Sequence, residues 1–451
     1  MRNLFIFIVV LMAAAAAAAE KPNVIIIFAD DQGYQDVGCF GSPKIKTPHL
    51  DKMATEGMRF TDFYSASAIC SPSRAALLTG CYPPRVGFTA VLWPNSSTGL
   101  NPAETTIAEM LKEQGYATIC IGKWHLGHRE PFLPTSQGFD EYFGIPFSND
   151  MSVDRKAKVA ANAVFREGMT VERMRSSKPK KSWVPLMRGT EIVEYPADQT
   201  TLTKRYTEEA ISFMDRNKDK PFFVYLPHTM PHIPLFASPA FKGKSERGLY
   251  GDVIEEMDWS VGQILDHLRK TGLDKKTLVV YTSDNGPWNL RGGRGGNALP
   301  LRGYKFQTYE GGMREPAIAW MPGTIQAGQT CSEVTGTIDL LPTIAHISGA
   351  QLPEKKIDGK NAWPLYLGTA GAKSPHDAYF YCRKNTAQAV RAGDWKLRKD
   401  KKIELFNLAK DISEKENLAD KHPEKVAELQ KIRDAFNKEL SSNKRPMGRT
   451  K

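Results

Sequence analysis

The sequence predicts an α/β fold in which helices cover both faces of a mainly parallel β-sheet. Four short apolar runs, rich in β-branched and aromatic residues, have the composition of buried parallel strands and lie at residues 24–28, 118–121, 222–226 and 277–281. Stretches with helical periodicity separate them, at residues 105–114, 201–216 and 252–271. Strands that alternate with helices are typical of a parallel sheet, whose ligands gather at the carboxyl ends of its strands.

The chain begins with a pattern typical of a secretory signal peptide. Within residues 1–19, the charged Arg2 precedes an apolar run and then a run of alanines. We therefore expect export to the periplasm or the medium. The remaining chain is long enough for one large domain, expected at residues 20–373, and a smaller one, expected at residues 374–451. The later sequence holds no uncharged apolar run long enough to span a membrane.

The C-terminal part predicts a small α+β subdomain with a short antiparallel sheet. Short strands are expected at residues 387–391, 395–398 and 404–406, before an amphipathic helix at residues 423–440. We expect the basic tail, residues 444–451, to be disordered. Residues 150–198 differ from both parts, since they have few apolar residues and many charges, and they predict an irregular excursion over the surface.

The basic composition favours an anionic partner. The net charge is +11 and the pI is near 9.2. The most basic stretches, residues 178–181 and 399–402, lack the interleaved aromatic residues and the motifs of nucleic-acid-binding domains, so no nucleic-acid partner is expected. A solvated basic face or a polyanionic sugar substrate accounts for the same charge. The six cysteines have the spacing of neither a zinc site nor a dense disulfide framework, and their pairing stays open.

Carboxylate and amide side chains follow two of the predicted strands. Asp30 and Asp31 come after the first strand, and Asp284 and Asn285 come after the fourth. Each pair alone is commonly a turn or a helix cap. Together they offer three carboxylates and an amide oxygen at strand ends. These hard oxygen ligands are the set that Ca²⁺ takes, and Mg²⁺ is the alternative that the same set leaves open.

Cationic and histidine side chains follow the other two strands. Lys123 and His125 are two residues apart, so in an extended segment both point to the same side. His228 and His232 lie in a proline-rich segment, and Lys305 precedes a glycine-rich turn. Each of these residues has a structural explanation when taken alone. Only their combination predicts a catalytic site.

Cys70 opens the run Cys-Ser-Pro-Ser-Arg, which an apolar helix start follows. By itself this run is compatible with a buried structural thiol. Together with the strand-end residues it resembles the signature of the formylglycine-dependent sulfatases of the alkaline phosphatase superfamily, and it looks closest to the arylsulfatase A and N-acetylgalactosamine-6-sulfatase branch. The matching segments occur in the family's order, at residues 27–34, 70–80, 122–127, 148, 232–234, 284–286 and 305–312.

The resemblance implies an alkaline-phosphatase-like sandwich that hydrolyses sulfate esters. Cys70 would be oxidised to Cα-formylglycine (3-oxoalanine) by a formylglycine-generating maturation enzyme, and the hydrated aldehyde would attack sulfur. Carried over by position, the ligands of the cation would be Asp30, Asp31, Cys70, Asp284 and Asn285. The catalytic residues would be Cys70, Arg74, Lys123, His125, His232 and Lys305.

The resemblance also implies individual roles. Arg74 would stabilise the hydrated aldehyde, while Lys123 and Lys305 would hold sulfate oxygens. His232 or Lys305 would protonate the leaving alcohol, and His125 would deprotonate the second hydroxyl of the hydrate. The expected substrate-binding residues are Ser148, His228 and Arg302, of which Arg302 lies in a glycine-rich loop that is equally compatible with a solvated surface.

Two other functions stay open at this point. A phosphodiesterase or phosphonate monoester hydrolase of the same superfamily would use much of the same site. A catalytically silent binder of sulfated glycans would need only the basic charge. For a sulfatase, the expected substrate is a sulfated carbohydrate or an aryl sulfate. The sequence does not indicate which sugar position carries the sulfate, nor the oligomeric state.

Overall fold

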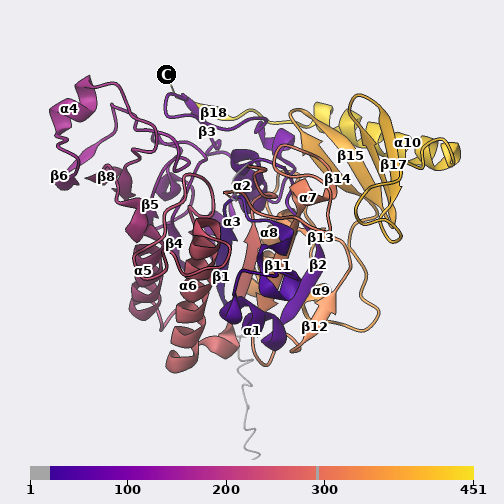
Figure 1. The fold of residues 1–451 in the computed structure, drawn as a ribbon, viewed down its shortest axis with the longest axis horizontal. Coiled ribbons are helices and arrows are strands. Elements are labelled where there is room, and N and C mark those ends of the chain that lie inside the picture. Colours follow the sequence, from indigo (N-terminus) through magenta and orange to yellow (C-terminus); the bar gives the residue numbers. More distant parts are fainter. Residues whose placement is uncertain (1–20, 291–293, 451) are drawn as a thin grey trace, which may run out of the picture.

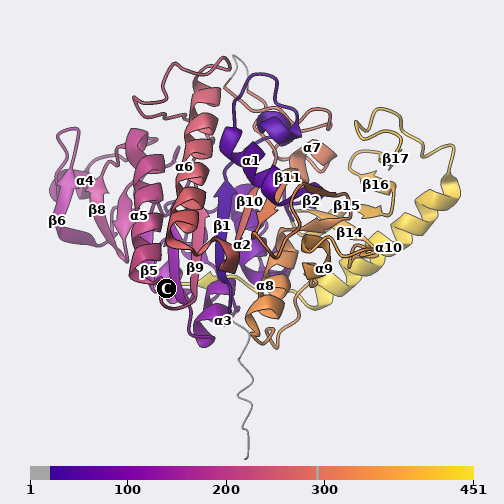
Figure 2. The same cartoon turned by 90° about the horizontal axis from the view of Figure 1, so that it is seen from below.

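The computed structural model describes residues 21–290 and 294–450 of the 451-residue chain, so the predicted signal peptide lies outside the described residues. Helices lie on both faces of a large central sheet, and a second, smaller sheet stands beside it (Figures 1 and 2). The predicted α/β fold with an additional C-terminal antiparallel sheet is confirmed.

The central sheet has parallel strands in its middle. Its strands are β1 (Asn23–Ala29), β2 (Met58–Tyr64), β4 (Ala117–Ile121), β5 (Glu141–Gly144), β6 (Val159–Phe165), β7 (Leu186–Arg188), β8 (Glu191–Tyr195), β9 (Phe222–Pro227), β10 (Thr277–Ser283), β11 (Arg314–Trp320), β12 (Gln329–Cys331) and β13 (Thr335–Gly336). Their order is β12-β2-β11-β10-β1-β9-β4-β5-β7-β8-β6, with β13 also paired to β2. The run from β10 through β1, β9 and β4 to β5 is parallel throughout. The carboxyl ends of these five strands therefore meet at one edge.

Two helical layers cover this sheet. The helices are α1 (Pro48–Glu56), α2 (Cys70–Thr79), α3 (Ile107–Glu113), α4 (Val171–Ser176), α5 (Leu202–Arg216), α6 (Leu249–Thr271), α7 (Glu310–Met313), α8 (Leu340–Ser348), α9 (Trp363–Tyr366) and α10 (Pro423–Ser442). Figure 2 shows α1, α5 and α6 on one side of the sheet and α2, α3 and α8 on the other. Side chains of β1 alternate between the layers: Ile25 and Ile27 join the core under α5 and α6, whereas Val24, Ile26 and Phe28 join the other core.

The smaller sheet consists of β14 (Tyr379–Arg383), β15 (Thr386–Ala392), β16 (Trp395–Lys399) and β17 (Ile403–Asn407), all antiparallel. Helix α10 packs against β15 and β16 and buries Leu429 and Leu440. The sequence predicted three of these strands and the helix. It did not predict β14, whose residues begin directly after a polar loop.

Two expectations about irregular segments are wrong. Residues 150–198 contain β6, α4, β7 and β8, and three of these elements extend the central sheet. The tail is ordered at residues 444–450, because β18 (Gly448–Arg449) pairs with β3 (Thr98–Gly99) and the Arg445 guanidinium lies 2.7 Å from a Glu104 carboxylate oxygen. In Figure 1 the tail runs from α10 back across the large domain to β3. The pairing of β7 with β5 joins the first segment to the rest of the sheet, and the pairing of β18 with β3 holds the tail; local composition indicates neither pairing.

Two further properties of the described residues concern membrane-spanning helices and the state of the cysteines. Among the described residues, no helix combines the length and the apolar character needed to cross a membrane. The six cysteines, all within the described residues, are free thiols, and five of them are buried.

Candidate active site

The four candidate metal ligands lie where two neighbouring parallel strands end. Asp30 and Asp31 follow β1, and Asp284 and Asn285 follow β10, whose last residue is paired in register with Ala29. All four side chains are buried. The Asp31 N–H donates to Asp284 Oδ1 at 3.1 Å, and Asn285 Nδ2 donates to Asp31 Oδ1 at 2.7 Å. The strand register thus brings together side chains that are more than 250 residues apart in sequence.

This oxygen cluster fits a hard cation. One carboxylate oxygen from each of Asp30, Asp31 and Asp284 can be chosen so that the three lie within 4.8 Å of one another. Among the described residues, Asp30 Oδ1 and Asn285 Oδ1 accept no hydrogen bond although both are buried. Buried polar atoms are rarely left without a partner. Converging oxygens of this kind are the ligands of Ca²⁺ or Mg²⁺.

Three buried cations surround the carboxylates. Arg74 Nη2 donates to Asp284 Oδ2 at 2.8 Å, Lys123 Nζ donates to Asp30 Oδ2 at 2.5 Å, and Lys305 Nζ donates to Asp31 Oδ2 at 2.6 Å. Arg74 also donates from Nη1 to the Lys123 carbonyl at 2.9 Å. None of the three cations is more than 3 % exposed, so their charges act through a medium of low polarity. A divalent cation added to this cluster would leave a net positive centre suited to an anion.

The charges shift the pKa values of the carboxyls in opposite directions. Burial would raise the pKa of Asp30, but the neighbouring cations Lys123 and Arg74, together with His232 and Lys305, hold it well below its usual range. Burial and the charge of Asp30 raise the pKa of Asp284 to about 7. One carboxylate is therefore firmly ionised, while the other readily takes up a proton until a cation offsets the repulsion.

Cys70 is the first residue of α2, a helix with no exposed residue. Its thiol lies close enough to Lys123, Lys305, Asp30 and Asp284 for their charges to act on it, yet burial raises the pKa of the thiol above its usual range. Reactive cysteines instead have a lowered pKa and carry a thiolate. The unmodified Cys70 thiol is therefore a poor nucleophile, although buried cations and carboxylates surround it.

His232 and Ser148 lie beside the same cluster. His232 Nε2 is 3.6 Å from Asp31 Oδ2, and Ser148 Oγ lies within 3.4 Å of the His232 ring nitrogens and within 3.3 Å of Lys123 Nζ. His232 Nδ1 lies 2.6 Å from the Ile233 carbonyl oxygen and 3.0 Å from Asn149 Oδ1. Burial and the charge of Lys305 lower the pKa of His232. The imidazole is thus held with Nε2 toward the site.

His125 and His228 are buried but lie in different settings. His125 has a φ of +60°, so the segment after β4 is not extended as the sequence analysis assumed, and its Nε2 lies 3.0 Å from the Leu92 carbonyl oxygen. Burial and the charge of Lys123 lower the pKa of His125 well below its usual range. Both ring nitrogens of His228 lack a hydrogen-bond partner within the described residues, and burial lowers its pKa to about 4. Both histidines are therefore neutral proton acceptors at neutral pH.

Comparison with known proteins identifies this arrangement. The family model described as Sulfatase matches residues 22–350, and the model described as N-sulphoglucosamine sulphohydrolase, C-terminal, matches residues 304–445. The chain belongs to the sulfatase family. It is 41 % identical over 385 residues to arylsulfatase A of Homo sapiens, covering 83 % of this chain and 74 % of that protein. It is 40 % identical over 387 residues to N-acetylgalactosamine-6-sulfatase of Mus musculus, covering 83 % and 71 %. The named relatives are sulfuric ester hydrolases, and this chain is a sulfatase by the same family criterion.

Solved structures agree with this assignment. The crystal structure of Ps i-CgsB in complex with k-i-k-neocarrahexaose superposes with a TM-score of 0.79 at 32 % identity, covering 93 % of each chain. PsFucS1 sulfatase from Pseudoalteromonas sp. superposes with a TM-score of 0.81 at 27 % identity, covering 95 % of this chain and 92 % of that one. The similarity thus includes the C-terminal sheet as well as the large domain.

One predicted site residue of this sulfatase lies outside the cluster, and two neighbours were not predicted. The exposed Arg302 donates from Nη1 to the Glu414 carbonyl at 2.7 Å and stacks over Tyr309, so it lies against the C-terminal part. Asn149 holds His232, and the Trp288 ring lies 5.5 Å from the His232 ring and 4.7 Å from Lys305 Nζ. In the sequence, Asn149 could have been found because it follows Ser148, and Trp288 because it lies directly after a strand-end loop.

Proposed function

We propose that this sulfatase removes sulfate from a carbohydrate sulfate ester, with Ca²⁺ held by the oxygen cluster and with residue 70 converted to Cα-formylglycine. The observation that carries the proposal is the set of three buried cations and three carboxylates around the first residue of α2. Such a site binds a tetrahedral anion beside residue 70. Hydrolysis of the ester also needs an electrophilic or nucleophilic group at residue 70, and the buried thiol does not supply one.

Asp30, Asp31, Asp284 and Asn285 would hold the cation, together with the oxygen of the modified residue 70. When bound, Ca²⁺ supplies positive charge that polarises the sulfate and lowers the energy of a neighbouring anionic oxygen. When residue 70 is formylglycine, its hydrate supplies one hydroxyl that attacks sulfur and a second hydroxyl whose deprotonation releases sulfate. The chain's own residues bind and orient the ester around these two groups.

Lys123 and Lys305 hold sulfate oxygens, because their ammonium groups lie against the carboxylates of Asp30 and Asp31 that line the site. Arg74 fixes Asp284 through two donors and keeps that carboxylate turned toward residue 70. His232 in its protonated form, or Lys305, gives a proton to the ester oxygen as its bond to sulfur breaks, and Asn149 holds the His232 ring in position. His125, neutral because it is buried, accepts the proton of the second hydroxyl.

A carbohydrate substrate agrees with the basic composition and with the similarity to Ps i-CgsB, which was solved in complex with k-i-k-neocarrahexaose. The phosphonate monoester hydrolase of Agrobacterium radiobacter shares the fold at a TM-score of 0.62 and 18 % identity, so it lends a phosphoester substrate no support beyond the fold. The catalytically silent binder is disfavoured by the complete set of charged side chains. Export and conversion by a host maturation enzyme belong to the same proposal.

The test is production together with a formylglycine-generating enzyme, followed by mass spectrometry of the tryptic peptide spanning residues 60–74 and by assays on an aryl sulfate and an aryl phosphodiester. We expect the aldehyde in this peptide and a larger kcat/KM for the sulfate. The Cys70→Ala variant should have the same melting temperature as the unsubstituted protein and should show no turnover above background. Faster phosphodiester cleavage, or full activity with an unmodified thiol, would contradict the proposal.

A further inference from the structure

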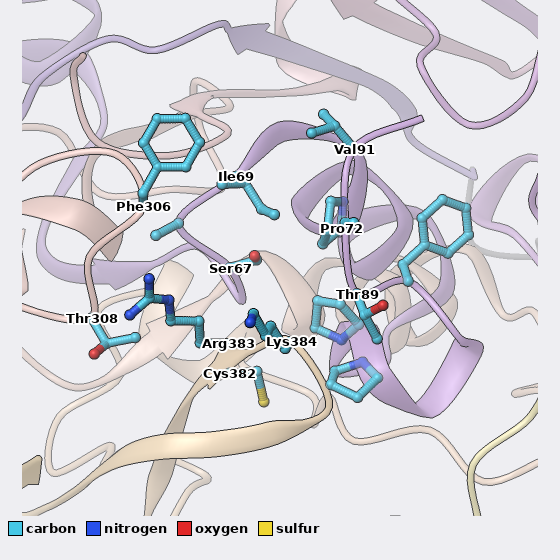
Figure 3. A pocket seen from close by; sticks show the side chains of 15 residues that line it. Ser67, Ile69, Pro72, Thr89, Val91, Phe306, Thr308, Cys382, Arg383 and Lys384 are labelled. Carbon is cyan, nitrogen blue, oxygen red and sulfur yellow. The ribbon is translucent and has the colours of Figure 1, made fainter. Parts of the chain in front are cut away.

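A pocket of about 210 Å³ lies between the large domain and the hairpin that joins β14 to β15. Figure 3 shows Ile69, Phe306, Pro72 and Val91 on one side of it and Arg383 and Lys384 on the other. The pocket is smaller than the cavities that take drug-sized ligands, about 300 Å³ or more, so it suits a single ring. Its walls come from loops and helix α2 of the large domain and from strand β14 with the turn that follows it.

The pocket adjoins the catalytic site. Two of its lining residues, Ile69 and Pro72, flank Cys70 in the chain, and Phe306 directly follows Lys305. The Phe306 N–H donates to the Ala68 carbonyl at 2.9 Å, which joins the two segments. Phe306 is therefore a wall that the pocket shares with the site around residue 70.

A row of aromatic rings runs from His232 in the candidate active site to Phe306 at the pocket. The Trp288 ring lies 5.5 Å from the His232 ring and 5.8 Å from the Phe306 ring. Lys305 Nζ lies 4.7 Å from the Trp288 centroid and 5.6 Å from the Phe306 centroid. A substrate with its sulfate at Lys305 would thus extend along these rings toward the pocket.

Phe306 combines a strained backbone conformation with an exposed side chain. Its φ is +74°, in the left-handed region that bulky side chains rarely adopt, and its ring is 42 % exposed. An exposed aromatic face beside a polar site is the surface on which the apolar face of a sugar ring packs. Strain and exposure at one residue point to a binding role.

The charge at the pocket has one sign. Its fifteen lining residues include two cations, Arg383 and Lys384, and no Asp or Glu. The nearest acidic group to Arg383 within the described residues is Asp400, at a loose 3.8 Å, and no carboxylate there lies within ion-pair distance of Lys384. By contrast, the larger hollow of about 780 Å³ beside β8 and α5 is lined by four glutamates and two arginines: Glu191, Glu194, Glu208, Glu209, Arg188 and Arg205. Of these two hollows, the smaller one combines an apolar floor with two cations and has no acidic lining residue.

We propose that this pocket binds the sugar next to the one that loses its sulfate, with the ring on Phe306 and an anionic group, sulfate or carboxylate, on Arg383 and Lys384. The inference rests on the proposed function and specifies it, because it makes the preferred substrate a sugar chain that carries a second negative charge. The cations lie at the rim and are exposed, so their effect on affinity is moderate.

The binding test uses the Cys70→Ala variant, which does not depend on turnover or on maturation. Titration calorimetry compares two disaccharides that carry the same scissile sulfate and differ in whether the neighbouring sugar is neutral or carries a carboxylate or second sulfate. We expect the Arg383→Ala/Lys384→Ala change to weaken binding of the doubly charged sugar about tenfold and to remove its advantage over the singly charged one. Lys401→Ala/Lys402→Ala is the matched control, since it removes two exposed lysines of the turn between β16 and β17, neither of which lines the pocket.

Equal weakening of both disaccharides, or the same loss in the control, would overturn the assignment of the pocket. So would tighter binding of the sugar with the neutral neighbour to the unsubstituted pocket. The corresponding turnover test is the ratio of kcat/KM for the doubly charged disaccharide to that for an aryl sulfate, which we expect to fall in the Arg383→Ala/Lys384→Ala protein. Absence of sulfate release from every substrate would refute the proposed function instead, while the binding titration still decides the role of the pocket.

Discussion

Lys396 is the residue whose replacement should reveal how the C-terminal sheet is held to the rest of the molecule. Its ammonium is fully buried, 2.7 Å from Glu310 Oε1 and 2.9 Å from Glu414 Oε1, and it lies 4.0 Å from the centroid of the Tyr381 ring. Both carboxylates are also fully buried. The Lys396→Met change keeps the approximate volume of the side chain and removes the charge that both carboxylates share.

Removing one partner of a buried ion pair costs about 3–5 kcal/mol, because the remaining charge stays buried without compensation. Glu310 keeps Arg314 at 3.4 Å and accepts hydrogen bonds from Tyr64 and Tyr381 at 2.6 and 2.7 Å. Burial already raises the pKa of Glu414 to about 7, so this carboxyl takes up a proton when its cation is lost. We therefore expect a loss of about 3 kcal/mol in the free energy of unfolding, near the lower end of that range.

The loss should also depend on pH. Burial already raises the pKa of Glu414 to about 7, and loss of Lys396 raises it further above that of the unfolded chain, so the native state binds this proton more tightly than the unfolded state. By linkage, the free energy of unfolding then falls as the pH rises through the pKa of Glu414. The destabilisation measured at pH 8 should exceed that at pH 6.

The measurement is urea unfolding followed by tryptophan fluorescence, with Trp395 next to the substituted position as a local probe. Lys399→Met is the matched control, since it removes an exposed lysine from the same strand and should change the free energy of unfolding by less than about 0.5 kcal/mol. Adding Glu414→Gln to the Lys396→Met protein should restore part of the loss. A loss below about 1 kcal/mol for Lys396→Met, or one that does not depend on pH, would refute this reasoning.

Removal of divalent cations with EDTA should abolish sulfate ester hydrolysis and added Ca²⁺ should restore it, because the buried strand-end carboxylates repel one another without a cation. Full activity in protein that metal analysis shows to be free of divalent cations would exclude this requirement. Lys123→Met removes the ammonium beside Asp30 and should lower kcat/KM for an aryl sulfate by about 100-fold, and a loss below tenfold would contradict its role. Gly448→Ala places a Cβ about 2.5 Å from the Phe132 ring and should lower the melting temperature, whereas an unchanged value would show that the tail does not pack there.

The sequence indicated the parts of this molecule that local patterns determine. Parallel strands buried on both faces read as continuous apolar runs, and the residues directly after them are placed by the strand ends. This reasoning brought Asp30 and Asp284 to the same edge of the sheet, and the register of β1 with β10 explains why. Near His125 it failed, because a positive φ turns the chain out of the extended conformation on which the expected direction of the side chain depended.

Long-range pairing accounts for what the sequence did not indicate. Strand β6 has no fully buried residue and lacks the apolar alternation by which strands are recognised. The tail is polar and basic, and it is ordered only because β18 pairs with β3 and Arg445 reaches Glu104. In both segments the stabilising contact is made by residues distant in the chain, so a window of neighbouring residues carries no information about it.

Other long-range contacts connect the C-terminal sheet to the candidate active site. Three successive residues after Lys305 are held by the C-terminal part: Thr308 Oγ1 donates to Gln388, the Tyr309 hydroxyl donates to Glu404, and the Glu310 N–H donates to Glu414, at 2.6–2.9 Å. These bonds fix the segment from which Lys305 reaches Asp31 and Phe306 reaches the pocket. Without the sheet, the buried Glu310 would lose its ion pair with Lys396, and the segment would lose the partners that set its path. The C-terminal sheet therefore supports the candidate active site, because it holds the segment that carries Lys305, the lysine proposed to bind sulfate, and contributes the rim of the neighbouring pocket.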